Sequence, residues 1–176
     1  MEISSQIEEL KRGREIIPAM VAGVSQEQAA WRPDPDRWTI LEVVNHLVDI
    51  EVEDFRFAMD LVLYRPEDSW AQFDIEAWRV ERAYNQQELS RLVTRFSEER
   101  AASISWLETL DNPDMDALHS GKGFSWKPMR AGDVLVSWIA HDLFHIRQLA
   151  LLRRELLEHY SQPYSGRYSG FALPEE

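Results

Sequence analysis

A mostly apolar stretch at residues 138–152, WIAHDLFHIRQLALL, constrains the fold more than any other part of this chain. Ten of its fifteen side chains are apolar, and on an α-helix they form a wide surface that must be covered. His141 and His145 are four residues apart, so they share one helix face, where two imidazoles can bind one metal ion. We therefore predict a buried helix that binds a divalent metal, with His46 from another helix as the third ligand.

Four segments of the chain repeat apolar residues at the spacing of an α-helix. The second segment opens with Thr39 and Glu42 at the spacing of a capping box, and it ends at Arg65, which precedes Pro66. No segment has a convincing strand pattern. We predict an all-α four-helix bundle, with helices at residues 3–23, 39–64, 85–110 and 130–159.

The predicted connections are long for a bundle, in which two to eight residues are usual. They cover residues 25–38, 65–84 and 111–129. Long connections permit crossovers and often carry function, and we expect one short helical turn within them at residues 75–82. Residues 1–160 are expected to form one domain, followed by an irregular tail, rich in Gly, Pro and Tyr, at residues 161–176.

Composition excludes several classes of function. The chain of 176 residues has no cysteine, which excludes disulfides, thiolate metal sites and a cysteine nucleophile. Its formal net charge of −12 argues against binding a nucleic-acid backbone. No apolar run reaches the roughly 20 residues of a membrane span, and the N-terminus lacks the pattern of a signal peptide. We expect no membrane contact and a cytoplasmic location.

His46 lies on the second predicted helix, at the border between an acidic stripe and a broad apolar arc. Asp49 and Glu53 follow it by one and two turns, so they are candidates for a general base or for support of a ligand. A solvated acidic face explains them equally well. The apolar arc, which includes Val48 and Met59, is wider than one core face requires. Either the long connections or a second subunit must cover it.

The order and spacing of these features resemble the DinB/YfiT-like superfamily over roughly residues 5–155. The resemblance rests on Trp38-Thr39-Ile40 followed by His46, on the DIEAW segment at residues 74–78, on His119 with Gly121, Gly123 and Asp133, and on His141 and His145 followed by Gln148. It implies a four-helix bundle of up-down-down-up topology. It also implies that His46, His141 and His145 bind one divalent metal ion and that the protein forms homodimers.

The resemblance also suggests a class of reaction, because characterised relatives include S-transferases that use bacillithiol and isomerases that use mycothiol. Three imidazoles leave a tetrahedral ion one open position, as is usual in catalytic sites. Our first hypothesis is a transferase, dependent on zinc or nickel, that attaches a low-molecular-weight thiol to a small electrophile. Because the chain has no cysteine, that thiol must be a cosubstrate. Gln148 is a third candidate near the chemistry, to orient a ligand or a substrate.

Three other interpretations remain open, although we favour an enzyme. The first is metal-dependent hydrolysis of a small molecule, and the second is a binding module whose ion only joins two helices. A third is that each histidine is an ordinary core or surface residue. HDLFH also resembles the zincin protease motif, but it has Asp142 in place of Glu and no third-ligand motif follows. His119 cannot be placed, and His159 lies ~27 Å along the helix from His141.

Overall fold

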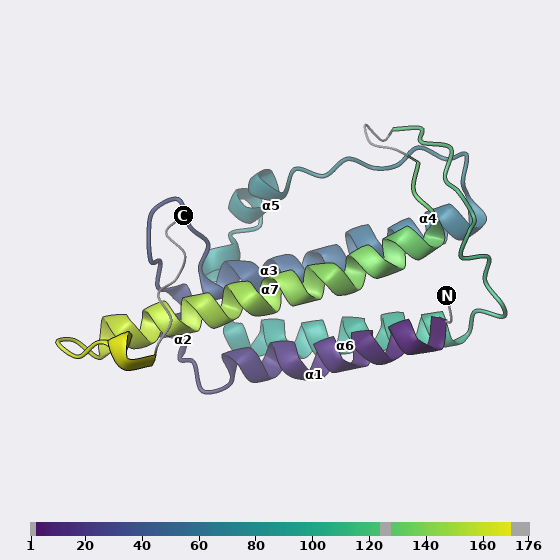
Figure 1. The fold of residues 1–176 in the computed structure, drawn as a ribbon. Coiled ribbons are helices and arrows are strands. Elements are labelled where there is room, and N and C mark those ends of the chain that lie inside the picture. Colours follow the sequence, from purple (N-terminus) through teal and green to yellow (C-terminus); the bar gives the residue numbers. More distant parts are fainter. Residues whose placement is uncertain (1–2, 124–127, 170–176) are drawn as a thin grey trace.

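The computed structural model describes residues 3–123 and 128–169, and every long element in them is a helix. Four long rods lie side by side, and the short helices lie in the connections between them (Figure 1). The rods are α1 (Ile3–Val21), α3 (Ile40–Ile50) continued by the π-helical η1 (Glu51–Arg56) and by α4 (Phe57–Tyr64), α6 (Leu89–Glu108) and α7 (Ala131–Tyr160). The predicted all-α four-helix bundle is confirmed. No helix in the described part of the chain is long and apolar enough to cross a bilayer.

The four rods have an up-down-down-up arrangement (Figure 1). Near the end of α7, Arg153 donates a hydrogen bond of 2.7 Å to the carbonyl oxygen of Met20 near the end of α1, so α1 and α7 run parallel. Gln26 follows α1, and its side-chain oxygen accepts a hydrogen bond of 2.9 Å from the backbone N–H of Leu89 at the start of α6. The α3–η1–α4 rod therefore runs with α6 and against α1 and α7, as the resemblance implied.

The capping box at Thr39 is confirmed, but the third long helix begins later than predicted. The Thr39 side chain accepts from the Glu42 N–H at 3.1 Å, and the Glu42 carboxylate accepts from the Thr39 N–H at 2.8 Å. Asn85, the predicted start of the third helix, instead accepts a hydrogen bond from the Thr39 hydroxyl and donates one to the carbonyl oxygen of Ala30. These contacts hold Asn85 in a short 3₁₀ turn, η2 (Tyr84–Gln86), and α6 starts at Leu89.

The connections contain more helix than the sequence predicted. Helix α2 (Gln26–Ala30) lies in the first connection, where Ser25 forms a capping box with Gln28. Helix α5 (Ile75–Glu81) agrees with the predicted turn at residues 75–82. In the expected irregular tail, η3 (Gly166–Ser169) is a 3₁₀ turn, and residues 170–176 lie outside the described residues. Pro18 lies within α1 and does not end it.

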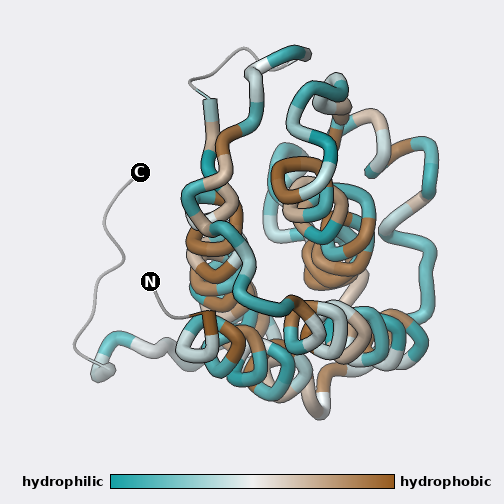
Figure 2. The backbone as a smooth tube through the Cα atoms, turned by 90° about the vertical axis from the view of Figure 1, so that its right-hand side faces the viewer, coloured by the Kyte–Doolittle hydropathy of each residue, from teal (hydrophilic) through white to brown (hydrophobic). Residues whose placement is uncertain are grey.

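The wide apolar surface of the second predicted helix is covered within the chain. All eleven residues of α3 are buried, and Val48 and Met59 are each 0% exposed. Helices α2, α5, α6 and α7 and the turn η2 all pack against α3. Figure 2 shows hydrophobic segments concentrated on the helices of the bundle. Of the two covers that the sequence left open, the connections and neighbouring helices suffice, so this surface gives no support for a dimer.

The second predicted helix is not α-helical throughout, because residues 51–56 form the π-helix η1. Its wider turn lies where the buried Glu51 meets two neighbouring rods. The Glu51 carboxylate accepts a hydrogen bond of 2.9 Å from Arg100 Nε on α6 and one of 3.0 Å from Trp138 Nε1 on α7. The apolar pattern did not reveal this π-segment, and such segments are frequent at functional sites.

A buried ionic cluster joins α1, η1, α6 and α7. Arg100 is 1% exposed and pairs with Glu51 at 2.8 Å and with Asp142 at 2.5 Å. The lack of a side chain at Gly13 on α1 lets this helix lie close to the ion pair, because a Cβ atom there would lie 2.4 Å from an oxygen of Asp142. Sequence reasoning missed this cluster. The available signal was an arginine within the apolar stripe of α6, one turn after the fully buried Phe96.

Candidate metal centre

Three histidines from two rods meet between α3 and α7. His46 Nε2 lies 3.2 Å from His141 Nε2, which lies 3.0 Å from His145 Nε2. Tetrahedral zinc bound at about 2.05 Å would hold such nitrogens about 3.3 Å apart, so the spacing fits a small divalent ion. In the described part of the chain, this is the only group of His, Asp or Glu side chains with ligand atoms gathered closely enough to hold a metal. The structure thus brings together all three predicted ligands.

Helix geometry explains why these residues meet. His141 and His145 are one turn apart on α7, and their ring centroids are 4.3 Å apart. The α3–η1–α4 rod runs antiparallel to α7, so His46 near the middle of α3 lies opposite this pair. The ring centroid of His46 is 5.2 Å from that of His141 and 4.9 Å from that of His145.

Burial keeps the three imidazoles neutral. It lowers the pKa of His46 to about 3, with a further contribution from His145. Burial, together with the other two histidines and Arg100, lowers the pKa of His141 to about 2. Burial also lowers the pKa of His145. Metal binding requires neutral imidazoles, so these ligands lose no protons when an ion binds at neutral pH.

A hydrogen bond orients one of the three imidazoles, that of His145, toward the other two. His145 Nδ1 lies 2.7 Å from Gln148 Oε1, which can only accept, so Nδ1 carries the proton and Nε2 presents its lone pair. The predicted role of Gln148 in orienting a ligand stays a prediction. The buried Nδ1 atoms of His46 and His141 have no hydrogen-bond partner among the described residues. The convergence of their Nε2 atoms on one point is what an ion would satisfy.

Aromatic rings surround the three imidazoles. Trp38 meets His46 edge-on at 5.2 Å between centroids, Phe55 meets His141 at 5.3 Å, and Phe144 meets His145 at 5.0 Å. Phe144 is 57% exposed, so this wall borders the protein surface. Such walls lower the local dielectric constant and strengthen the interaction of a bound ion with charge nearby.

The predicted carboxylates Asp49 and Glu53 are paired with other side chains. Asp49 accepts hydrogen bonds of 2.7 Å from the Tyr84 hydroxyl and from Arg82, and Glu53 accepts two from Arg82, at 2.6 and 3.0 Å. Neither has a described contact with the three histidines. A general-base role for either stays a prediction, and the ion pairs favour a structural role.

The remaining two histidines lie outside the centre. His119 is 1% exposed; its Nδ1 accepts from the N–H of Gly121, and its Nε2 donates to the carbonyl oxygen of Asp68. His119 therefore links the connection after α4 to the connection before α7. His159 lies near the far end of α7, where its ring centroid is 4.9 Å from that of Trp31. This position agrees with the long separation from His141 that the sequence predicted.

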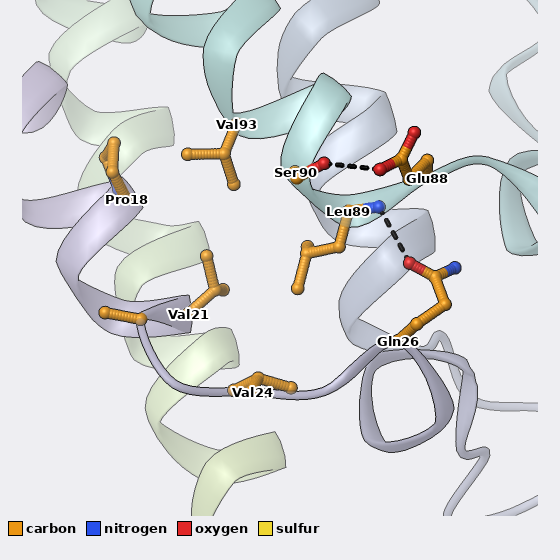
Figure 3. A pocket seen from close by; sticks show the side chains of 9 residues that line it. Pro18, Val21, Val24, Gln26, Glu88, Leu89, Ser90 and Val93 are labelled. Atoms are coloured by element: carbon orange, nitrogen blue, oxygen red, sulfur yellow. Dashed lines mark hydrogen bonds between the residues drawn. The ribbon is translucent and has the colours of Figure 1, made fainter.

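A separate groove of about 680 Å³ lies where α1 ends and α6 begins (Figure 3). Its walls are mostly aliphatic, as at Val21 and Leu89, and Glu88 is the one ionisable residue among the described residues that line it. Glu88 accepts a hydrogen bond of 2.6 Å from the Ser90 hydroxyl. The groove offers no constellation for acid–base or metal chemistry, so the three-histidine centre is the stronger candidate.

Comparison with known proteins agrees with this description. The model of the DinB superfamily matches residues 9–149 of the chain. Among solved structures, YfiT from Bacillus subtilis superimposes with a TM-score of 0.75 at 18% identity, covering 87% of this chain and 86% of that one. That protein is described as a probable metal-dependent hydrolase with an unusual four-helix bundle topology. Comparison with curated proteins finds no match. Because the family model spans most of the sequence, this chain belongs to the DinB superfamily.

Proposed function

We propose that the protein is a metal-dependent enzyme in which His46, His141 and His145 hold one divalent ion, and that it transfers a low-molecular-weight thiol to a small electrophile. The observation that carries the proposal is the convergence of three buried, neutral imidazoles at the spacing of ion ligands. A bound divalent ion would act as a Lewis acid and lower the pKa of a thiol or a water molecule beside it.

The chain's own residues supply the surroundings of that chemistry. Gln148 fixes the tautomer and the ring orientation of His145. Trp38, Phe55 and Phe144 limit access of water to the centre. The chain has no cysteine to act as the nucleophile, which favours a thiol that arrives as a cosubstrate. The homodimer, the cytoplasmic location and the choice of zinc or nickel also remain predictions.

Two alternatives differ in what they require of the site. Hydrolysis of a small molecule is favoured by the description of YfiT as a probable metal-dependent hydrolase. A purely structural ion would call for a fourth protein ligand. The cluster among the described residues offers three side chains, His46, His141 and His145. This number favours a site with one position left for a substrate.

Metal content is the first test of the proposal. Protein purified without a nickel column should contain about one divalent ion per chain, and His46→Ala should lose it. His159→Ala is the matched control, because its imidazole lies outside the centre and its loss should leave the metal content unchanged. Wild-type protein that stays metal-free after reconstitution with zinc would refute the proposal.

Activity then separates the two reactions. Metal-loaded protein is incubated with a small thiol and a set of electrophiles, and thiol consumption is compared with that of His46→Ala. Turnover that requires both thiol and metal supports transfer. Turnover of an ester or amide without thiol supports hydrolysis and would overturn the transferase assignment.

A further inference from the structure

Asp54 is a half-buried acidic side chain, and no cation of the described residues pairs with it. It belongs to η1, and its carboxylate has no ion pair or hydrogen bond among residues 3–123 and 128–169. Burial raises the pKa of its carboxyl to about 6. Neighbouring carboxylates on the same rod, such as Glu51 and Glu53, pair with arginines. Asp54 therefore bears a desolvation cost that no described contact offsets.

Asp54 lines a cavity of about 220 Å³ with aromatic walls. Phe55 contributes to it from η1, Trp70 and Phe73 contribute from the connection after α4, and Ser137 contributes from α7. None of the described residues that line it is a lysine or an arginine. The volume suits one substituent of a substrate better than a whole drug-sized molecule.

This cavity adjoins the candidate metal centre. Phe55 forms part of its wall, and the ring of Phe55 also meets His141 at 5.3 Å and stacks on Trp138 at 5.5 Å. Ser137 precedes His141 by four residues on α7, about 6 Å along the helix axis. A substrate that reacts at the three histidines can therefore place another part of itself beside Asp54.

We propose that this cavity binds an ammonium group of the substrate, with Asp54 as its counter-ion and Trp70 and Phe73 as aromatic walls. That this ligand is part of a substrate rests on the proposed function. An ammonium group would form charge-assisted hydrogen bonds with the carboxylate and would be attracted to the ring faces. The Ser137 hydroxyl offers a further acceptor. A neutral apolar group would instead leave the carboxylate desolvated and unpaired.

Binding of two small probes tests the charge preference directly. Benzylammonium and the neutral benzyl alcohol have similar size, and both are titrated by NMR into the metal-loaded protein at pH 7.5. Wild-type protein should prefer benzylammonium, and Asp54→Asn should lose that preference by about tenfold or more. Asp60→Asn is the matched control, because Asp60 is an exposed partner of Arg65 and its loss should leave the preference unchanged.

Benzyl alcohol also reports whether the cavity is intact in each variant. If Asp54→Asn binds neither probe, Asp54→Glu decides, since a retained negative charge should restore the preference for benzylammonium. An unchanged preference in Asp54→Asn, or none in wild-type protein, would overturn the proposal.

The same titration on His141→Ala separates this proposal from the proposed function. His141 does not line the cavity, so benzylammonium should still bind when the metal is lost. If wild-type protein stays metal-free after reconstitution with zinc but still binds benzylammonium through Asp54, the metal enzyme is refuted and the cation site is retained. Metal-dependent turnover without any effect of Asp54→Asn on ammonium binding would refute the cation site alone.

Discussion

Replacement of Gly13 by alanine should destabilise the protein, although the same change stabilises most helices. A glycine-to-alanine change inside a helix ordinarily gains about 1 kcal/mol. Here the new Cβ would lie 2.4 Å from Asp142 Oδ2 and 3.1 Å from Arg100 Nη1. Asp142 cannot move away freely, because Arg100 holds both of its oxygens, at 2.5 and 2.8 Å.

The magnitude follows from what the clash disrupts. Breaking a buried ion pair costs about 3–5 kcal/mol, because each charge is left without its partner. After subtraction of the gain in helix propensity, the net loss is about 2–4 kcal/mol. For a chain of this size, each kcal/mol lowers the melting temperature by about 2–4 °C, so the expected fall is about 4–16 °C.

Urea unfolding of metal-free protein, followed by circular dichroism, measures this difference without the contribution of metal binding. Ser4→Ala, at an exposed position of the same helix, is the control and should change stability by less than about 0.5 kcal/mol. If Gly13→Ala is as stable as wild-type protein or more stable, then Arg100 and Asp142 do not form the rigid buried pair described above.

Three further predictions concern the site and its neighbourhood. The lowered pKa values of His46 and His141 mean that the unfolded chain binds more protons than the folded one between about pH 6.5 and 3. The free energy of unfolding of metal-free protein should therefore be highest above about pH 6.5. It should fall as the pH drops, by on the order of 2 kcal/mol per histidine at pH 5. Urea midpoints that stay constant from pH 7 to pH 5 would contradict this. Gln148→Ala frees the ring of His145 and should weaken metal affinity about 10- to 100-fold in a competition titration with a chelator, whereas unchanged affinity would remove Gln148 from the site. Asp54 has a raised pKa, so its ionisation lowers the free energy of unfolding as the pH rises from about 4 to 6. Asp54→Asn should therefore gain about 1–3 kcal/mol of stability at pH 7 and almost nothing at pH 4. An equal gain at both pH values would show that charge is not the cause.

Some features could be predicted from the sequence because they depend on short-range geometry. The i, i+4 spacing of His141 and His145 places both imidazoles on one face of any helix that contains them. The capping box at Thr39 depends on residues within one turn and formed as predicted. The third predicted ligand, His46, needed more information, since its distance from the pair depends on how two rods pack.

Other features depend on partners far along the chain, and sequence reasoning missed or misplaced them. Arg100 is buried because carboxylates from two other rods, Glu51 and Asp142, compensate its charge, and nothing local on α6 reveals them. Asn85 has the local pattern of a helix start, but hydrogen bonds to Thr39 and Ala30 hold it in a separate turn. Tertiary hydrogen bonds outweighed the local preference for a cap there.

Short-range sequence patterns are enough to predict the class of fold and the chemistry of the candidate site. Helical periodicity selects a bundle, and the lack of cysteine leaves histidine and carboxylates as the ligands for a zinc-like ion. Which polar side chains lie together depends instead on how the rods pack. This packing brought His46 to the histidine pair and tied Asp49 to Arg82, while it left Asp54 lining an aromatic cavity. The physical reason is that a side chain's charge and pKa depend on what packs against it in space, whereas periodicity reports only which face of its own helix it occupies.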